Sequence, residues 1–461
     1  AAAAEADVVV VTITPDCFVN KGPGRPVFSE LLRAEAVCAL DCVTAVAINR
    51  WPDAVPTIEL LRPNVYVKGP DYQHAADDTT GGIQREQEAI ERCGGRLHIT
   101  DDVTFSSSQL INRHLPTLAP AMREFLHTYS EKHSFREIRT LIESLADLKV
   151  LVVGESIIDD YHYCRTLGKS GKEPILAVRF ERSETFAGGI LAVANHVSAL
   201  TNHVDVLSFL GPEDRYWSFV EGELSPSIGK HLLRQTAPTI VKRRFVESYP
   251  LQKLFEVYIM DGAEHCPRSS ALLCERLQSI ASNYDVVIVV DYGHGMLSAP
   301  ARAMLQEESR FLAVNTQVNA GNQGFHTISK YGRVNFICLS EQEARMDVRH
   351  KQRPLQDIAL EITQRHSSSC MMMTRGDKGV LTYARTSGFA DVPAFTGSAI
   401  DRIGAGDRVL SLSALCAYRG ASPETLGLLG NAAGYMAVQT VGHRQTLDRT
   451  ALLKFLEHTL K

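Results

Sequence analysis

The sequence has no apolar run long enough to cross a bilayer and no excess of positive charge. Its longest apolar blocks, such as 286–290, have the length of a buried strand, whereas a membrane-spanning helix needs about 20 apolar residues. The 48 Lys and Arg residues against 53 Asp and Glu residues leave a formal net charge of −5. Proteins that coat nucleic acids are usually basic. We therefore expect neither a membrane nor a nucleic acid as a partner.

The cysteines carry no recognisable chemistry. None of the ten forms a C-x-x-C pair, and no His or Cys pair stands at zinc-ligand spacing. A disulfide scaffold requires a short, cysteine-dense secreted chain, and this chain is neither short nor cysteine-dense. The cysteines suit a reducing compartment and no secretory signal peptide is visible, so we expect a cytoplasmic location.

The first 113 residues alternate strand and helix patterns. At about 100–200 residues per domain, a chain of 461 residues suggests two to four domains. Residues 1–6 resemble the end of a helix, and 7–14 form a β-branched run typical of a buried parallel strand. Further strands are expected at 43–48, 65–67 and 96–100, with helices at 30–40 and 82–93. The pattern predicts a Rossmann-like unit whose first β-loop-α element is missing.

Residues 114–148 lack the alternating strand and helix patterns of the first 113 residues. Two prolines at 116 and 120 interrupt any regular element. Ser134 then has the pattern of a helix N-cap with Glu137 three residues later, and an apolar stripe at 138, 141, 142 and 145 follows. We interpret this segment as a structured linker that contains one amphipathic helix.

A second α/β domain is expected from 149 to 461. Its first strand is KVLVVG at 149–154, and further strands are expected at 204–209, 286–291, 311–314, 334–339 and 370–374. The segments 175–180 and 239–258 are rich in strand formers but are not followed by helices. They predict a small antiparallel lid inserted into the parallel framework.

The strongest motif is DRIGAGD at 401–407, directly before a helical pattern. Glycines at a helix N-terminus let backbone N–H groups point at an anion, and the helix dipole adds positive potential. Asp407 lies in the first turn, where its carboxylate could take a proton from an attacking hydroxyl. Taken alone, the motif also fits an ordinary glycine-rich helix start with a capping carboxylate.

Other motifs follow in an order that resembles the ribokinase-like (PfkB) sugar kinases over the whole of 149–461. The resemblance implies that Gly404, Ala405 and Gly406 form the anion hole and that Asp407 is the catalytic base. It assigns the sugar to Asp159, Gly188, Gly189 and Asn195. It assigns the nucleotide to Thr374, Arg375, Gly376, Gly379 and Asn431. It also implies Mg²⁺ and ATP as cofactors, with Glu343 reaching the metal partly through water.

Within that family, IIDDY at 157–161, TIVKRRF at 239–245 and VVDYGHGML at 289–297 resemble the kinase half of the bifunctional ADP-heptose synthesis enzymes. Lys242, Arg243 and Arg244 are then candidates for contact with a sugar phosphate, although a solvated charge run is an equal alternative. The sequence departs from the family pattern at four points: Ala192 and Ser340 stand where Asn is expected, Arg408 replaces a small residue, and the family's Asp-Pro-Lys segment reads Asn-Thr-Gln at 315–317.

The first unit holds cations and hydroxyls suited to a triphosphate. These residues are Lys21, Arg25, Lys68, Ser106, Ser107 and Ser108. They resemble the cytidylyltransferase-like nucleotidyltransferases, including the other half of the same bifunctional enzymes. The His-x-Gly-His motif of that family is absent from the sequence. The unit should therefore be a poor catalyst as it stands, and the domain order is reversed.

We expect a sugar or sugar-phosphate kinase, acting on a substrate like heptose 7-phosphate, joined to a sugar-1-phosphate nucleotidyltransferase unit. The partners implied are a small sugar or sugar phosphate and a nucleoside triphosphate, with a homodimer suggested by resemblance. Three alternatives stay open: a kinase whose first unit only binds or dimerises, a non-catalytic sugar sensor, and a nucleoside kinase.

Overall fold

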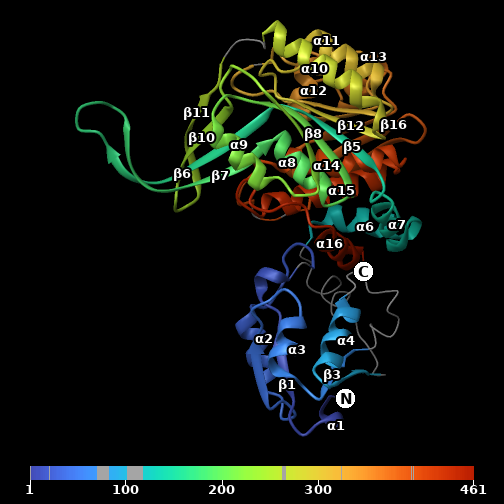
Figure 1. Cartoon of the computed structure of the whole chain (residues 1–461). Coiled ribbons are helices and arrows are strands. Elements are labelled where there is room, and N and C mark those ends of the chain that lie inside the picture. Colours follow the sequence, from blue (N-terminus) through green and yellow to red (C-terminus); the bar gives the residue numbers. More distant parts are fainter. Residues whose placement is uncertain are drawn as a thin grey trace. The chain divides into compact units, whose positions relative to one another are not determined.

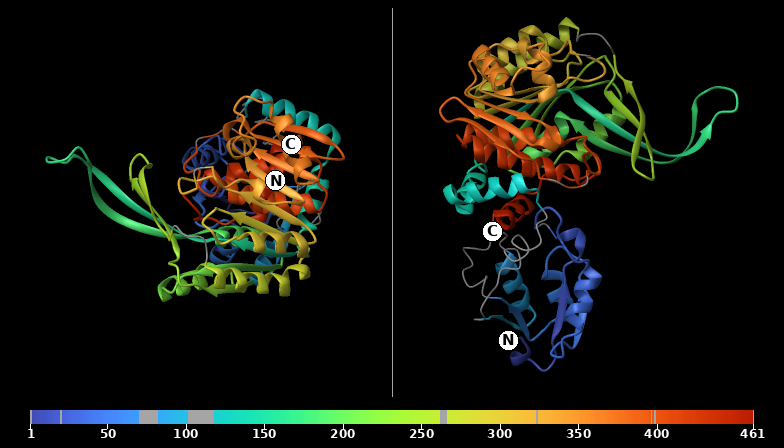
Figure 2. Two further views of the ribbon diagram at one scale, coloured as in Figure 1. Left: turned by 90° about the horizontal axis from the view of Figure 1, so that it is seen from above. Right: turned by 180° about the vertical axis from the view of Figure 1, so that it is seen from behind.

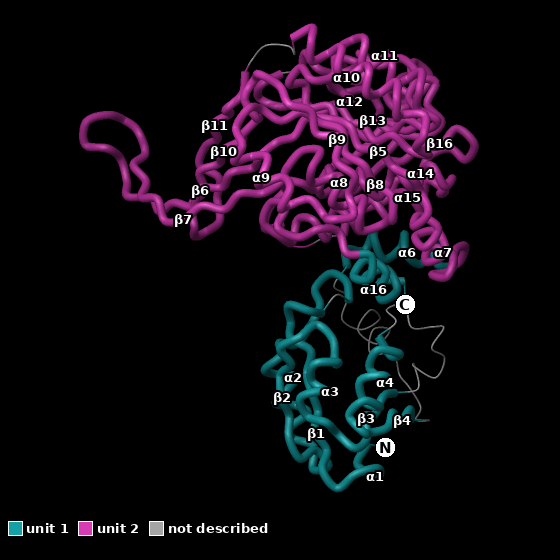
Figure 3. The backbone as a smooth tube through the Cα atoms, in the orientation of Figure 1, with its two compact units in different colours: residues 1–130, 449–461 teal, residues 131–448 magenta. Residues whose placement is uncertain are grey.

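The structure is a computed structural model that describes residues 2–19, 21–69, 82–100, 118–261, 266–322, 324–395, 397 and 399–460. The chain divides into two compact units (Figure 3). The first comprises residues 1–130 and 449–461, and the second comprises residues 131–448. These boundaries differ from the expected ones at 113 and 149, because the last helix groups with the first unit and a helix of the expected linker groups with the second.

The first unit contains two separate parallel strand pairs. Strand β1 pairs with β2, and β3 pairs with β4. The elements are α1 (Ala2–Glu5), β1 (Val10–Ile13), η1 (Asp16–Phe18), α2 (Glu30–Cys38), β2 (Ala45–Ile48), α3 (Val55–Leu61), β3 (Val65–Lys68), α4 (Gly82–Arg92), β4 (Arg96–Ile99), α6 (Pro120–Lys132) and α16 (Arg449–Leu460). The expected strands and helices are therefore present, while the two pairs are not joined into one sheet within the described residues.

The second unit is built on a nine-stranded sheet with the order β17-β16-β15-β14-β13-β12-β5-β8-β9. Only β16 and β17 are antiparallel to their neighbours. The strands are β5 (Lys149–Gly154), β8 (His203–Leu210), β9 (Ile228–Arg234), β12 (Val286–Asp291), β13 (Leu312–Thr316), β14 (Phe336–Ser340), β15 (Cys370–Thr374), β16 (Val380–Ala384) and β17 (Gly388–Val392). The central strands β5 and β12 are almost wholly buried, as their unbroken apolar runs predict.

Helices cover both faces of this sheet (Figure 1). Helices α10–α13 lie on one face, and α8, α14 and α15 lie on the other. Their bounds are α7 (Phe135–Glu143), α8 (Ile190–Ser198), α9 (Asp214–Glu223), α10 (Pro267–Ile280), η4 (Ala281–Asn283), α11 (Ala299–Glu308), η5 (Ile328–Lys330), α12 (Glu341–Asp347), α13 (Leu355–Arg365), η6 (Gly376–Lys378), α14 (Ala405–Tyr418) and α15 (Pro423–Val438). The expected α/β class is confirmed.

A four-stranded sheet with the order β11-β10-β6-β7 forms the lid. It consists of β6 (Ser156–Lys169), β7 (Leu176–Gly189), β10 (Ile240–Glu247) and β11 (Gln252–Ile259). Both views in Figure 2 show the β6–β7 hairpin reaching away from the rest of the second unit. The lid is larger than expected, because the segment after the first strand continues directly into β6, and β10 pairs with β6 in parallel.

The predicted amphipathic helix of the linker is α7, and its start is confirmed. Ser134 Oγ accepts the N–H of Glu137 at 3.3 Å, and the Glu137 carboxylate accepts the N–H of Ser134 at 3.2 Å. Ile138 and Ile142 are buried, as the apolar stripe predicts. In the parts of the chain that the structure describes, no helix is long and apolar enough to span a bilayer.

Candidate active site

The carboxyl ends of the parallel strands β5 and β12 lie side by side at the centre of the large sheet, where the order of the strands reverses: β8 and β9 follow β5 on one side, and β13–β17 follow β12 on the other. Such a switch point is the usual ligand position in an open α/β sheet. Glu155, directly after β5, joins the two ends: its carboxylate accepts the N–H of Tyr292 at 3.0 Å and of His294 at 3.1 Å. Burial, together with the nearby charge of Asp291, raises the pKa of Glu155 to about 8.

The N-terminus of α14 provides an anion cradle. Gly404 caps the helix with φ +79°, a left-handed conformation that favours glycine. The first i to i−4 hydrogen bond of the helix is donated by the N–H of Arg408 to Gly404 O, at 3.1 Å. Within the described part of the chain, the N–H groups of Gly406 and Asp407 have no hydrogen-bond partner. They are therefore available to an anion.

Asp407 lies in the first turn of α14, beside this cradle. Tyr292 Oη donates to Asp407 Oδ1 at 2.9 Å, and His443 Nε2 lies 3.8 Å from Asp407 Oδ2. The Asp407 side chain is 14% exposed, and burial raises its pKa above the usual range. A carboxylate that is both accessible and more basic than usual is suited to accept a proton.

Asp159 lies on β6 and faces the same region. Arg244 forms an ion pair with it, and His443 Nε2 is 3.5 Å from its Oδ2. Although burial opposes the effect, these two cations hold the pKa of Asp159 below its usual range. A β-carbon at Gly188, diagonally across on β7, would overlap the Asp159 carboxylate. Gly189 ends β7 with φ +57°, and a β-carbon there would lie 2.6 Å from Glu155 O.

The three basic residues of β10 have different surroundings. Lys242 is 5% exposed, and its Nζ lies 5.0 Å from the ring centre of Tyr258 and 5.2 Å from that of Tyr292. Arg244, on the same face, pairs with Asp159 and with Glu256. Burial lowers the pKa of Lys242.

Arg243 does not belong to this group. Strand alternation turns its side chain to the other face of the lid, where its Nε donates to Asp160 Oδ2 at 2.7 Å. Arg243 is therefore a partly exposed, paired residue of the other face, while Lys242 and Arg244 are buried.

Asn195 is engaged elsewhere. Its Nδ2 donates to Glu223 O at 3.0 Å, and its Oδ1 accepts the N–H of Ser225 at 3.0 Å. Both ends of the amide thus join α8 to the segment before β9. We therefore withdraw its assignment to the sugar and give it a structural role.

The sequence motifs do not include His443, and they do not reveal the structural role of Asp401. Asp401 accepts the hydroxyl of Tyr161 at 3.0 Å and the N–H groups of Ile403 and Gly442 at 3.0 and 3.1 Å, and it also pairs with Lys253. It therefore braces the loop that leads into α14. No sequence motif identifies His443, because the residue lies 36 positions after Asp407 and outside every motif. Only the folded structure brings it next to Asp407.

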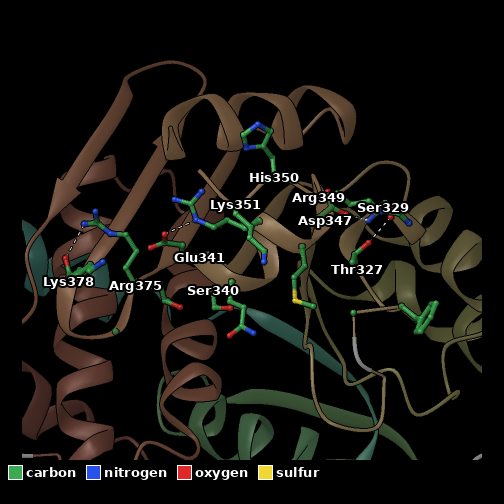
Figure 4. A pocket seen from close by; sticks show the side chains of 17 residues that line it. Thr327, Ser329, Ser340, Glu341, Asp347, Arg349, His350, Lys351, Arg375 and Lys378 are labelled. Atoms are coloured by element: carbon green, nitrogen blue, oxygen red, sulfur yellow. Dashed lines mark hydrogen bonds and ion pairs between the residues drawn. The ribbon is translucent and has the colours of Figure 1, made fainter. Parts of the chain in front are cut away.

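A cavity of about 1090 Å³ opens beside the ends of β14 and β15 (Figure 4). Three predicted nucleotide residues, Thr374, Arg375 and Gly376, line it together with Ser340. Its basic lining residues also include Arg345, Arg349, His350, Lys351 and Lys378. Figure 4 shows the long side chains of Lys351 and Arg375 at its border. The cavity suits a polyanion of nucleotide size.

The other two predicted nucleotide residues act on the backbone. Gly379 has φ +89°, and a β-carbon there would overlap the carbonyl of Val392. Asn431 Nδ2 donates to Val392 O at 3.1 Å and to Pro393 O at 2.9 Å. Both residues therefore fix the end of β17 next to the loop at 374–379.

Glu343, predicted to approach a metal, belongs to the capping box of α12. Its Oε2 accepts the N–H of Ser340 at 2.7 Å, and its Oε1 accepts the N–H of Val318 at 3.1 Å. Burial raises its pKa, and the charge of Asp407 adds to this effect. Among the described residues, no three His, Cys, Asp or Glu side chains form a metal cluster.

Arg408 is 4% exposed and donates to the carbonyl of Gln445. Burial lowers its pKa to about 10. It therefore ties α14 to the segment that carries His443.

The predicted triphosphate residues of the first unit are only partly described. Lys68 Nζ pairs with Glu86 Oε2 at 2.9 Å, and Tyr66 Oη donates to the same oxygen at 3.2 Å. Burial lowers the pKa of Arg25. Lys21 is exposed. Ser106, Ser107 and Ser108 lie outside the described residues.

Comparison with known proteins gives consistent matches. The chain is 27% identical over 297 residues to the bifunctional protein HldE of Histophilus somni, covering 64% of this chain and 61% of that protein. It is 25% identical over 324 residues to HldE of Shewanella amazonensis, covering 69% and 66%. The matches thus span about three fifths to two thirds of the length of these relatives.

Solved structures show the fold. Phosphofructokinase-2 from Escherichia coli matches with a TM-score of 0.56 at 16% identity, covering 67% of this chain and 99% of that one. Ribokinase from Thermotoga maritima matches with a TM-score of 0.52 at 18% identity, with the same coverage. The expected ribokinase-like fold is confirmed. Residues 311–450, which include Glu343 and Asp407, match the family model of the pfkB family carbohydrate kinases.

Proposed function

We propose that the second unit transfers the γ-phosphoryl group of ATP to a hydroxyl of a sugar or sugar phosphate. The observation that carries this proposal is the position of Asp407 beside the N–H groups of Gly406 and Asp407 at the start of α14. Asp407 takes the hydroxyl proton as the sugar oxygen bonds to phosphorus and the bond to the ADP oxygen breaks. The cradle at 404–407 stabilises the charge on the transferred group.

The sugar lies between Asp407 and Asp159 in this proposal. Asp159 is held as a carboxylate by Arg244 and His443, so it accepts hydrogen bonds from sugar hydroxyls. Lys242 is a buried cation beside Asp159, and it favours a substrate that carries an anionic group. A heptose 7-phosphate-like substrate fits this requirement.

ATP occupies the cavity beside 374–378, with its terminal phosphate directed to the cradle. Magnesium is commonly held by one or two carboxylates together with nucleotide phosphates, so it needs no cage of protein ligands. Glu343 is a partly buried carboxyl group whose pKa is raised by burial, and a nearby cation would stabilise its charged form. Glu343 therefore fits an ion that it would reach through water. When bound, magnesium neutralises phosphate charge.

The test is ADP release from Mg-ATP across a panel of sugars and sugar phosphates, including heptose 7-phosphate. The variant is Asp407→Asn, and the matched control is Asp214→Asn, an exposed carboxylate at the start of α9. We expect turnover with a small set of substrates, a loss of about 10²–10⁴-fold in Asp407→Asn, and no change in the control.

The same panel separates the alternatives. Sugar binding without ADP release would overturn the kinase proposal in favour of a sensor. Turnover with nucleosides but not sugars would indicate a nucleoside kinase.

For the first unit, the proposal is a nucleotidyltransferase acting on a sugar 1-phosphate. Two observations support this proposal: the strands of the first unit form parallel pairs, and Lys68 lies at the carboxyl end of β3. Pyrophosphate release from a nucleoside triphosphate and sugar 1-phosphate tests it. If none is released while the kinase is active, the first unit has a binding or dimerising role.

A homodimer through the lid is the proposed assembly. On the face of the lid opposite Asp159, an aromatic row crosses all four strands: Phe180, His162, Phe245 and Phe255. Phe180 and Phe255 are 56% and 51% exposed, which is costly for an unpartnered sheet. Light scattering should give the mass of a dimer for the wild type and of a monomer for Phe180→Asp/Phe255→Asp. Leu60→Asp, at an exposed position of the first unit, is the control.

A further inference from the structure

His443 lies between the two carboxylates of the proposed site. Its Nε2 is 3.5 Å from Asp159 Oδ2 and 3.8 Å from Asp407 Oδ2, and its side chain is 5% exposed. Its ring also lies against the anion cradle, because a β-carbon at Gly404 would lie 2.5 Å from His443 Cε1. A single imidazole therefore touches the sugar-binding carboxylate, the base and the helix start.

The segment around His443 is held at several points. The N–H of Gly442 donates to Asp401 Oδ2 at 3.1 Å, and the carbonyl of Gln445 accepts from Arg408. The N–H of Leu447 donates to His196 Nδ1 at 3.1 Å. The segment is thus fixed on both sides of residue 443, so the ring is placed by the fold.

The charged surroundings of His443 are well defined. Asp159 faces it from β6, Asp407 from α14, His196 from α8 and Arg244 from β10. Burial lowers the pKa of His443, but the hydrogen bond and charge of Asp159 and the charge of Asp407 outweigh this and raise it. Burial lowers the pKa of His196, which stays neutral.

We infer that His443 is a positioning residue that carries a proton in the resting enzyme and keeps Asp407 ionised for proton abstraction. The inference rests on the proposed kinase function and deepens it. Partial burial and the charge of a second carboxylate, Asp159, both raise the pKa of Asp407 and so favour its protonated, inactive form. The ionisable groups that act on Asp407 are Tyr292, Asp159, Lys242, Glu343 and His443. Of these, His443 forms the ion pair with its carboxylate.

The activity test compares pH profiles of kcat/KM for the wild type, His443→Gln and His203→Gln. His203 is a matched control because it is exposed at the start of β8, away from the site and from the proposed dimer surface. We expect the acid limb of His443→Gln to move up by about one to three pH units, with activity returning towards the wild-type level at high pH. At pH 6 the loss should be about 10–10³-fold. A loss that is equal at every pH would overturn the inference, because it would indicate a structural role.

A second measurement does not depend on turnover. NMR titration of ¹⁵N-histidine-labelled protein, with the His443 signal assigned by its loss in His443→Gln, gives the midpoint of this imidazole. We expect a midpoint above the ordinary value of about 6.5 and a lower midpoint in Asp159→Asn. A midpoint at or below 6.5 in the wild type would overturn the inference. If no sugar is turned over, the kinase proposal fails and the titration alone decides the charge of His443.

Discussion

Gly188 and Asp159 are diagonal neighbours on the β6–β7 pair, so close that a β-carbon at position 188 would overlap Asp159 Oδ2. The carboxylate cannot move aside freely, because Arg244 and His443 hold it. The glycine is therefore required by a side chain of the site, whereas its neighbour Gly189 is required by its positive φ.

Gly188→Ala should displace the Asp159 carboxylate and weaken sugar binding. We expect the KM for the sugar to rise about tenfold or more with a smaller change in the KM for ATP, because misplacement near a reacting group is costly. Gly222→Ala in α9 is the control, since a β-carbon there meets nothing within 4 Å. Unchanged sugar affinity in Gly188→Ala would contradict the assignment of Asp159.

Asp401→Asn should destabilise the second unit by about 2–4 kcal/mol, because it removes a buried charge partner of Lys253 and an acceptor of backbone N–H groups. Burial opposes the effect, but Lys253 and these N–H groups hold the pKa of Asp401 below its usual range. The stabilisation is therefore present at neutral pH and is lost as the pH falls through the folded-state value.

Urea unfolding at pH 7, and at pH values stepped down below the ordinary aspartate pKa of 3.8, where the folded carboxylate takes up its proton, measures this difference. The control is Asp391→Asn, whose carboxylate is 57% exposed and pairs with Arg375, and which should cost about 0–1 kcal/mol. Equal costs for the two substitutions would argue against the bracing role of Asp401.

The nucleotide cavity can be tested by charge reversal. Lys351→Glu/Lys378→Glu places two negative charges where the phosphates are proposed to lie, and should raise the KM for ATP about tenfold while leaving the KM for the sugar unchanged. Lys149→Glu/Lys230→Glu changes the net charge equally, at exposed positions on β5 and β9 outside the cavity. A rise in the KM for ATP in both double variants would indicate a general charge effect.

Much of the second unit could be predicted because its signals are local. The buried run at 286–291 gives β12, and the glycines before 407 give the start of α14, since each pattern depends only on neighbouring residues. The long strand β6 is not among the predicted strands, because two adjacent acidic residues interrupt its IIDDYHY segment, which therefore has neither a continuous apolar run nor a strict alternation.

The site was predicted less completely, because tertiary contacts decide which polar residues face it. Arg243 and Arg244 are adjacent in sequence, yet strand alternation directs one to Asp160 and the other to Asp159. Asn195 has a residue type suited to sugars, but its amide bonds to backbone groups. His443 enters the site through the folding of a distant loop, which no sequence spacing reports.

Glu155 should give the protein a distinctive pH dependence of stability. Its pKa is raised from 4.5 to about 8, because it is buried and faces Asp291. Between these two values the folded protein holds a proton that the unfolded chain releases, so the free energy of unfolding falls as the pH rises from about 5 to 8. One such proton contributes a slope of up to about 1.4 kcal/mol per pH unit.

Glu155→Gln removes this proton from both states. The variant should be less stable than the wild type at pH 5, because one of the N–H groups of Tyr292 and His294 loses its acceptor. Its free energy of unfolding should fall less steeply between pH 5 and pH 8 than that of the wild type. The difference in stability between the two proteins should therefore shrink as the pH rises. Glu307→Gln, at an exposed position of α11, should reproduce the wild-type slope. If the free energies of unfolding of the wild type and Glu155→Gln changed in parallel with pH, Glu155 would be ionised throughout this range. The hydrogen bonds from the N–H groups of Tyr292 and His294 would then account for the whole stabilisation of its carboxylate.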